Sequence, residues 1–326
     1  MKLGADDAAR LADAIAALRR GEVIGLPTET VYGLAADARN AEAVANIFQL
    51  KGRPADHPLI VHIADAGQLP QWASEVPEMA RKLAAAFWPG PLTLILKKRA
   101  DVPEIVTGGQ DTVGLRCPAH PLALTLLRQF GGGLAAPSAN RFGRISPTSA
   151  QHVRDEFGDK VPIVLDGGDC EVGIESTIVD LSGHIPRILR PGRIGKPELE
   201  AVIGPVAEGA QAQSPRVSGS LQSHYAPHTR TELLPRARLI ERAQACLQNG
   251  ENVLVLSIAH PVGTIPGLVL ADSPESYGHD LYAALRELDA RRADRLLLES
   301  PPLRTDWVAV LDRLSRAAAD TPEEDP

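Results

Sequence analysis

A hydroxyl-rich turn and two cationic residues occur within about thirty residues of one another near the start of the sequence. The turn spans residues 27–33 (PTETVYG), and Lys51 and Arg53 follow it after one predicted helix. Lysine and arginine donate charged hydrogen bonds and hydroxyl groups donate neutral ones, so such a set suits the binding of anions. A lone Lys-X-Arg is explained as well by the negative end of a helix dipole. The neighbouring hydroxyl groups favour an anion-binding site.

Further polar residues follow short apolar runs. Residues 111–116 (DTVGLR) predict a strand in which Thr112 and Arg116 share a face, because strand side chains alternate. A structural salt bridge explains Arg116 equally well. Ser138 and Asn140 follow another apolar run. No Ser/His/Asp or Cys/His arrangement accompanies these residues, so they indicate electrostatic and orienting roles rather than a protein nucleophile.

The helix that carries Lys51 has clear start and stop signals. Asn40 is a good N-cap residue, and apolar residues recur at helical spacing over 44–48. Gly52 suits the left-handed position that ends a helix. The following proline prevents the helix from continuing, and residues 59–63 predict a strand that carries His62.

Short helices and strands alternate through the first two thirds of the chain. Predicted helices begin near residues 6, 77, 120 and 148, the last with Thr148 as N-cap and Gln151 completing a capping box. Predicted strands cover 22–26, 92–96, 163–165, 175–180 and 188–192. This mixture indicates one α/β domain over residues 1–203.

The composition changes after residue 203. Residues 204–222 are rich in Gly, Ala, Gln, Ser and Pro, which predicts a linker, extended here over 204–230 to include the sequence HYAP. Periodicity then returns, with strands at 253–258, 268–270 and 295–298 and a helix at 281–288. These elements predict a small Rossmann-like α/β domain over 231–318. The acidic end, residues 319–326, is predicted to be disordered.

The overall composition limits the class of protein. A chain of 326 residues with 44% hydrophobic and 23% charged residues is ordinary for a two-domain globular protein. Its net charge of −7 argues against a general nucleic-acid coat protein. The three cysteines form no CxxC pair, and neither a signal peptide nor a membrane-spanning run is evident. We therefore expect reduced thiols and a cytoplasmic location.

Several ordered motifs resemble one known family. PTETVYGL at 27–34, KGRP at 51–54, PLIVHI at 58–63 and PSAN at 137–140 resemble the YrdC-type threonylcarbamoyl-AMP synthases, whose signature pairs K-x-R with a later S-x-N. HYAP at 224–227 resembles the linker of the long, two-domain form. The resemblance implies a YrdC-like twisted mixed sheet with helices, followed by a smaller Rossmann-like domain.

The resemblance also implies an activity. The family forms L-threonylcarbamoyladenylate and pyrophosphate from L-threonine, bicarbonate and ATP, with Mg²⁺ as the companion of the triphosphate. No P-loop sequence is present, so an ATP site must be built differently. The product would pass to a tRNA threonylcarbamoyl-transfer complex that modifies adenosine 37.

The family's site residues carry over to positions that match its motifs. The resemblance implies a catalytic set of Lys51, Arg53, Ser138 and Asn140. It implies ATP contacts from the same four residues and from His57, Thr112, Ala136, Ser146, Arg190 and Tyr225. It implies L-threonine contacts from Thr30, His62, Arg116 and Ser176. Two departures are that His57 stands where many relatives have asparagine, and that SGSLQS before HYAP replaces a PGM-containing form.

Other functions fit parts of the sequence. A double-stranded RNA or tRNA-binding module without adenylyl transfer would use Lys51, Arg53, Arg141 and Arg144. Carbamoyl transfer is a third possibility, although the zinc-finger regions expected of hydrogenase-maturation carbamoyltransferases are missing. The linker and second domain are expected either to close over the nucleotide as a lid, or to stabilise the first domain or dock a partner.

Overall fold

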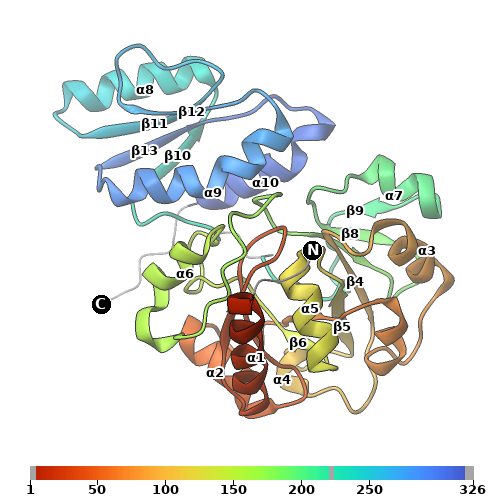
Figure 1. Ribbon diagram of the computed structural model, residues 1–326. Coiled ribbons are helices and arrows are strands. Elements are labelled where there is room, and N and C mark those ends of the chain that lie inside the picture. The colour runs from red at the N-terminus through yellow and green to blue at the C-terminus, as the bar shows by residue number, and fades with distance from the viewer. Residues whose placement is uncertain (1–4, 220–223, 320–326) are drawn as a thin grey trace. The chain divides into compact units, whose positions relative to one another are not determined.

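The computed structural model describes residues 5–219 and 224–319, which pack as two units (Figure 1). The first unit contains Met1–Arg141, Pro147–Glu171 and Glu175–Ser220. The second contains Phe142–Ser146, Val172–Ile174 and Leu221–Pro326. Two loops from the predicted first domain therefore pack with the second unit.

A nine-stranded mixed sheet forms the centre of the first unit. Its strand order is β1-β2-β6-β3-β5-β4-β7-β8-β9. The strands are β1 (Ile24–Leu26), β2 (Gly33–Asp37), β3 (Ile60–His62), β4 (Leu92–Lys97), β5 (Thr112–Arg116), β6 (Leu134–Ala135), β7 (Thr177–Asp180), β8 (Arg187–Arg190) and β9 (Ala207–Glu208). Parallel pairing of β3 with β5, and antiparallel pairing of β5 with β4, bring the candidate site residues of these strands side by side.

Helices cover the two faces of this sheet unequally. They are α1 (Ala5–Arg19), α2 (Ala41–Lys51), α3 (Glu78–Phe87), α4 (Glu104–Thr107), α5 (Pro121–Phe130), α6 (Ala150–Phe157) and α7 (Lys196–Ile203), with 3₁₀ turns η1 (Ala66–Gln71) and η2 (Gly158–Lys160). Helices α2, α3 and α6 pack with Leu34, Val61 and Leu115 in the larger core. Helices α1 and α5 pack with Ala35 and Leu134 on the other face, at the end of the sheet formed by β1, β2 and β6. The remaining part of that second face is where the polar site residues lie.

Local signals explain how α2 begins and ends. The Asn40 side chain accepts hydrogen bonds from the backbone N–H groups of Glu42 and Ala43, which confirms the predicted N-cap. Gly52 follows the helix with φ 63°, the left-handed conformation predicted for it. Lys51 is therefore the last residue of a firmly terminated helix.

Two local predictions were wrong. Ser149, not Thr148, caps α6, because its hydroxyl accepts from the N–H of His152, and the Gln151 side chain bonds to Asp155 instead of completing a capping box. Residues 163–165 form no strand and are joined to the sheet by a single bridge from Val164 to Gly25. Pairing with the sheet is therefore limited to one residue, which is too short for a strand.

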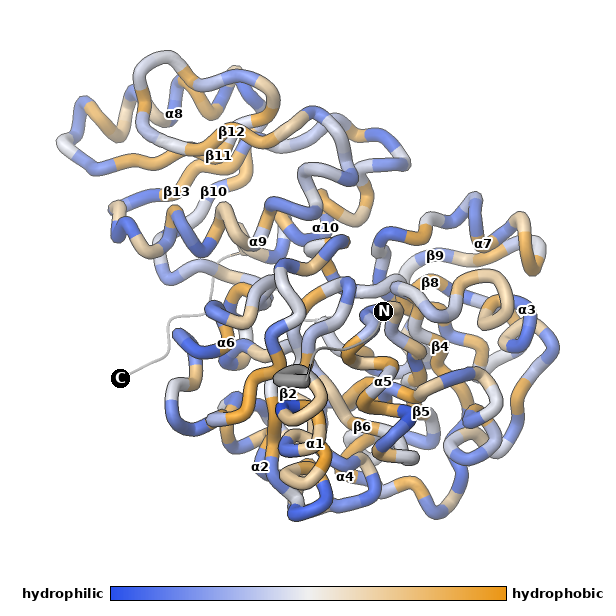
Figure 2. The backbone as a smooth tube through the Cα atoms, viewed as in Figure 1, coloured by the Kyte–Doolittle hydropathy of each residue, from blue (hydrophilic) through white to orange (hydrophobic). Residues whose placement is uncertain are grey.

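The second unit is a smaller parallel α/β fold. Its sheet has the order β10-β13-β11-β12, formed by β10 (Thr231–Leu234), β11 (Val253–Ile258), β12 (Gly267–Leu270) and β13 (Arg295–Glu299). The helices are α8 (Arg236–Gln248), α9 (Pro274–Ala290) and α10 (Val308–Ala317), with the 3₁₀ turn η3 (Thr305–Trp307). Figure 2 shows β11 and β12 as mainly hydrophobic and α8 with alternating character, as expected for an amphipathic helix. Strand β11 is buried over nearly its whole length, whereas in β12 only Leu270 is buried. Within residues 5–219 and 224–319, no helix has the length and hydropathy that crossing a membrane requires.

Candidate active site

A row of polar side chains crosses one face of the first unit's sheet. Val61, Leu94 and Leu115 of β3, β4 and β5 face the larger core. Neighbouring residues must face the opposite way, because side chains alternate along a strand. That opposite face presents His62 and Arg116, which are partners in the register of β3 and β5.

His62 and Arg116 both bury polar atoms that have no hydrogen-bond partner among the described residues. These atoms are Nδ1 of His62, and Nε and Nη2 of Arg116. Burial, and then the positive charge of Arg116, lowers the pKa of His62 to about 3, so the imidazole is neutral near pH 7. Because buried polar groups are normally hydrogen-bonded, this adjacent pair is suited to a small polar ligand.

Glu29 is the charge partner of Arg116. Its Oε1 lies 2.8 Å from Nη2 of Arg116, and both side chains are only 5% exposed. The other carboxylate oxygen accepts a hydrogen bond from the N–H of Ala119 at 3.0 Å. The hydroxyl-rich turn thus holds the guanidinium in place through a buried ion pair, and this pair leaves Nε of Arg116 available.

The row continues from β5 across β4 and β7 to β8. The antiparallel register pairs Leu94 of β4 with Leu115 of β5, so Thr93 and Arg116 are the next residues along these two strands. The hydroxyl groups of Thr93 and Ser176 are 2.8 Å apart. Arg190, at the end of β8, donates from Nε to the carbonyl of Ser176 and from Nη2 to its hydroxyl, each at 3.1 Å. A predicted threonine ligand and a predicted ATP ligand are therefore bonded to each other.

Ser218 joins Arg190 to Arg53. Nη1 of Arg190 donates to the Ser218 carbonyl at 2.9 Å, and Nη2 of Arg53 donates to its hydroxyl at 3.2 Å. The Ser218 hydroxyl donates to the Pro58 carbonyl at 2.9 Å, and Arg53 donates to the same oxygen at 2.9 Å. Both arginines assigned to ATP are thus positioned by one serine.

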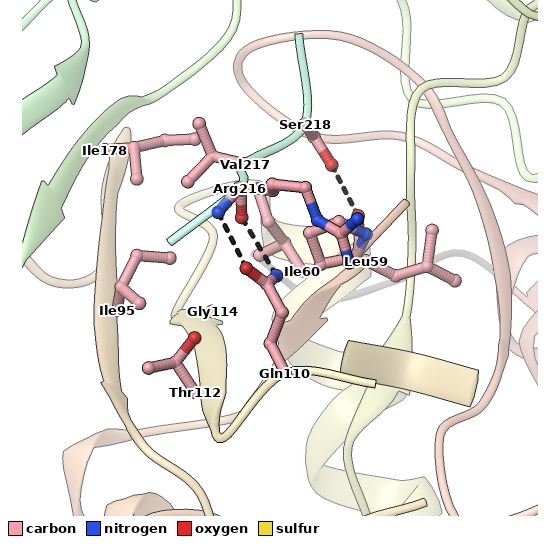
Figure 3. Close-up of a pocket in the computed structure, with 11 residues that line it drawn as sticks. Leu59, Ile60, Ile95, Gln110, Thr112, Gly114, Ile178, Arg216, Val217 and Ser218 are labelled. Carbon is pink, nitrogen blue, oxygen red and sulfur yellow. Dashed lines mark hydrogen bonds between the residues drawn. The ribbon is translucent and has the colours of Figure 1, made fainter. Parts of the chain in front are cut away.

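The segment 216–218 is built into the first unit beside a small recess (Figure 3). Val217 packs against Ile95 and Ile178 of the sheet. The side-chain amide of Gln110 accepts from the N–H of Arg216 at 2.7 Å and donates to its carbonyl at 3.2 Å. The recess is also lined by Pro58, Leu59, Ile60, Thr112, Gly114 and Ser218. Thr112 is thus placed beside the segment that positions the two arginines.

Lys51 connects the two signature motifs directly. Its Nζ donates to the carbonyl of Ser138 at 2.6 Å and to that of Asn140 at 2.5 Å. The side chain is buried, and burial followed by the charge of Arg53 lowers the pKa of Lys51 well below its usual value. The K-x-R lysine therefore fixes the backbone of the S-x-N loop.

Local hydrogen bonds and bridges fix the remaining first-unit residues. The hydroxyl groups of Thr28 and Thr30 are 2.9 Å apart, and Thr28 also donates to the Val31 carbonyl. Gly33 forms an isolated bridge with Ser138. The N–H of Ala136 donates to the carbonyl of Ile60 in β3.

The remaining predicted ATP ligands are His57, Ser146 and Tyr225. Ser146 and Tyr225 belong to the second unit, where Tyr225 is buried against Tyr282 and the guanidinium of Arg313. His57 lies in the first unit, in the loop after Arg53, and is half-buried. Its imidazole lies 4.0 Å from Asp56, and burial followed by the charge of Arg53 lowers its pKa. These three assignments stay predictions from the sequence.

The geometry disfavours the RNA-binding alternative. Lys51 is 3% exposed and Arg53 7% exposed, and each is engaged by backbone carbonyls. Phosphate backbones are bound by accessible cations. Lys51 and Arg53, two of the four cations in the RNA-binding hypothesis, are therefore unsuited to binding an RNA backbone.

Known proteins resemble this chain over nearly its whole length. The family model described as "Telomere recombination" matches residues 16–192, and the model described as "Threonylcarbamoyl-AMP synthase, C-terminal domain" matches residues 194–319. The threonylcarbamoyl-AMP synthase of Pyrococcus abyssi is 40% identical over 313 residues, 92% of each chain. The chain belongs to the threonylcarbamoyl-AMP synthase family. The Bacillus subtilis family member is 41% identical over 325 residues, 95% of this chain and 93% of that one.

A solved structure of the family has the same fold. The crystal structure of P. abyssi Sua5 complexed with L-threonine matches with a TM-score of 0.92 and 38% identity, covering 98% of this chain and 96% of that chain. This match confirms the predicted fold class, a mixed twisted sheet followed by a smaller α/β domain.

Sequence reasoning missed three residues that organise this family member's site. Glu29 lies within the recognised turn, but its partner Arg116 is far along the chain. Thr93 is a lone hydroxyl in an apolar strand, which is a usable signal that it faces a polar site. Ser218 lies in a stretch whose composition predicts only a linker.

The neutral state of His62 predicts a pH dependence of stability for this threonylcarbamoyl-AMP synthase family member. The unfolded side chain has a pKa of about 6.5, whereas the folded pKa is about 3. Between these values only the unfolded state binds the proton, so the free energy of unfolding falls as pH decreases. We expect His62→Gln to flatten this fall between pH 7 and 5, measured by urea unfolding.

The matched control for this test is His184→Gln, which changes an exposed histidine of the same unit. It should leave the wild-type pH dependence of unfolding in place. Equal slopes for wild type and His62→Gln would show that His62 is not held neutral by its surroundings.

Proposed function

We propose that this protein makes threonylcarbamoyl-AMP and pyrophosphate from L-threonine, bicarbonate and ATP. The observation that carries the proposal is the buried pair of His62 and Arg116, which are register partners on one face of the sheet and each bury polar atoms without a hydrogen-bond partner among the described residues. Family membership and the threonine-bound relative support the same conclusion.

The threonine half of the site would lie on β3, β5 and the start of β7. Arg116 binds the threonine carboxylate through its free Nε, while Glu29 keeps the guanidinium oriented. His62 is neutral, so it offers a hydrogen bond without adding a second positive charge. Thr30 and Ser176 supply hydroxyl groups for the remaining polar atoms of the substrate.

The nucleotide half would be formed by the arginines and the S-x-N loop. Arg53 and Arg190 are held near Ser218 with their charges directed by hydrogen bonds. Lys51 fixes the loop that presents Ser138 and Asn140. Thr112, the backbone of Ala136 and, in line with the sequence prediction, His57, Ser146 and Tyr225 complete the proposed ATP contacts.

The reaction needs orientation and charge stabilisation more than covalent catalysis. The threonine amine attacks the carbon of bicarbonate, and loss of water gives N-carboxythreonine. A carbamate oxygen then attacks the α-phosphate of ATP, and the bond to pyrophosphate breaks. The nucleophile and ATP are both anions, so fixed cations and hydroxyl dipoles lower the barrier by holding them together.

We propose that magnesium enters as part of the ATP substrate. No group of three or more His, Cys, Asp or Glu residues able to hold a metal ion occurs in the part of the chain that the structure describes. Triphosphate oxygens are preferred ligands of Mg²⁺ and would supply most of its coordination.

The expected fate of the product places the reaction in tRNA modification. Threonylcarbamoyl-AMP is a reactive mixed anhydride, so a transfer complex must accept its threonylcarbamoyl group onto adenosine 37 of tRNA. We propose a cytoplasmic location for this step, as the sequence analysis predicts.

The test is pyrophosphate release from ATP and Mg²⁺, with threonine and bicarbonate omitted in turn and serine offered in place of threonine. We expect release to require both substrates, and mass spectrometry to detect threonylcarbamoyl-AMP. Release that is indifferent to either substrate would contradict the proposed function.

A further inference from the structure

The loop after the S-x-N motif, residues 142–146, makes contacts along its length within the second unit. The ring of Phe142 lies edge-on to His224, with centroids 6.1 Å apart. The carbonyl of Gly143 accepts from the N–H of Ala226 at 2.9 Å, and Arg144 donates to the Pro227 carbonyl at 3.3 Å. Consecutive residues of one loop are therefore fixed by the HYAP segment.

Helix α9 holds the end of the same loop through one arginine. Nη2 of Arg286 donates to the carbonyl of Ile145, and its Nε donates to that of Ser146 at 3.4 Å. Arg286 is half-buried, so these charge-assisted bonds are partly shielded from water. Ser146 is the residue of this loop assigned to ATP.

A second loop, residues 172–174, also packs against helix α9. A Cβ atom at Gly173 would lie 2.4 Å from the carbonyl oxygen of His279 and 2.5 Å from that of Gly278, so the backbones touch. Ile174 packs beside Gly278. Residues 172–174 directly precede Ser176, so both loops held by α9 are continuous with residues assigned to substrate.

We propose that Arg286 is a positioning residue for ATP, which fixes the backbone of residues 145–146 and thereby the contact assigned to Ser146. The proposal rests on the proposed function, because the ATP contact of Ser146 belongs to it. An unpaired loop would sample more conformations, and ATP binding would then have to restrict them. The second unit would in this way act on substrate affinity through a loop rather than through a reacting group.

The test compares Arg286→Met with wild type in the full-length protein. Methionine keeps an unbranched apolar stem and removes the donors. We expect the KM for ATP to rise about tenfold, equivalent to about 1.4 kcal/mol, with kcat and the KM for threonine changed less than about twofold. Arg286→Lys keeps a charged donor and should restore part of the ATP affinity.

Trypsin provides a readout independent of catalysis. The loop contains cleavable bonds after Arg141 and Arg144. Release of the loop in Arg286→Met should accelerate cleavage at these bonds, identified by mass spectrometry, and ATP should slow it. The matched control is Arg291→Met, at the exposed C-terminal end of α9, where the arginine pairs with Glu287. It should change neither the KM for ATP nor the cleavage rate.

The outcomes separate the two proposals. An unchanged KM for ATP in Arg286→Met would overturn the positioning role, whether or not trypsin cleavage accelerates. An equal rise of the KM values for ATP and threonine would also overturn it, because a general structural defect predicts that result. If Arg286→Met fails to fold, Arg286→Lys should still raise the KM for ATP, by less than tenfold, and an unchanged KM for ATP in that variant would overturn the positioning role. If wild type makes no product, the proposed function fails, and the cleavage pattern alone decides whether Arg286 holds the loop.

Discussion

Replacement of Lys51 with methionine is expected to reduce kcat/KM for threonylcarbamoyl-AMP formation by at least about a hundredfold. The side chain is buried, and its Nζ donates to the carbonyl groups of Ser138 and Asn140. Methionine has a similar length but no donor, so both carbonyls lose a partner and the S-x-N loop loses its anchor. The measurement is pyrophosphate release with ATP and threonine varied separately.

The matched control for this prediction is Lys82→Met, which changes an exposed lysine of α3. It should retain wild-type kinetics. Thermal unfolding of both variants distinguishes loss of the site from loss of the fold. A fall of less than about fivefold in kcat/KM, or less than 1 kcal/mol of transition-state stabilisation, would show that Lys51 is not needed to hold the loop.

Replacement of Glu29 with alanine is expected to lower the free energy of unfolding by about 3–5 kcal/mol. The variant leaves the guanidinium of Arg116 buried without its carboxylate, and it also removes the acceptor for the N–H of Ala119. The KM for threonine should rise as well, because Arg116 is no longer held toward the substrate. Urea unfolding and steady-state kinetics measure the two effects separately.

A double variant identifies the cause of the instability. Glu29→Ala combined with Arg116→Met removes both charges, so it should be more stable than Glu29→Ala alone. It should also be less active than Glu29→Ala, because it removes the guanidinium proposed to bind threonine. Glu75→Ala, which breaks an exposed pair with Lys97, should cost at most about 1 kcal/mol. If Glu29→Ala is no less stable than this control, the buried pair does not contribute as described.

Local signals in the sequence predicted those parts of the fold that depend on few neighbours. The N-cap at Asn40 and the left-handed Gly52 are properties of short segments, and both are present. Strand alternation likewise predicted a shared face for Thr112 and Arg116, two residues of one strand. By contrast, α8 was not predicted, although Leu239, Ala243 and Cys246 recur at helical spacing among many charged residues.

The site was harder to predict where it depends on distant contacts. Motif resemblance brought Lys51, Ser138 and Asn140 into one hypothesis, but not the bonds by which the lysine holds the loop. Ser218 could not be found from composition, because its role comes from Arg53 and Arg190 meeting it across the fold. The capping error at Thr148 arose because two adjacent hydroxyl residues fit the same local rule, and only the fold selects Ser149.

The division of the chain into interleaved segments limits how this protein can be dissected. Residues 142–146 and 172–174 pack with the second unit, whereas segment 216–218 packs with the first. Truncation at residue 203 would remove Val217 and Ser218 from the first unit, and truncation at 220 would still leave both loops without their partners. The C-terminal region is therefore not a detachable module, and an isolated fragment or a chimaera with another family member would need matching loops as well as a matching domain.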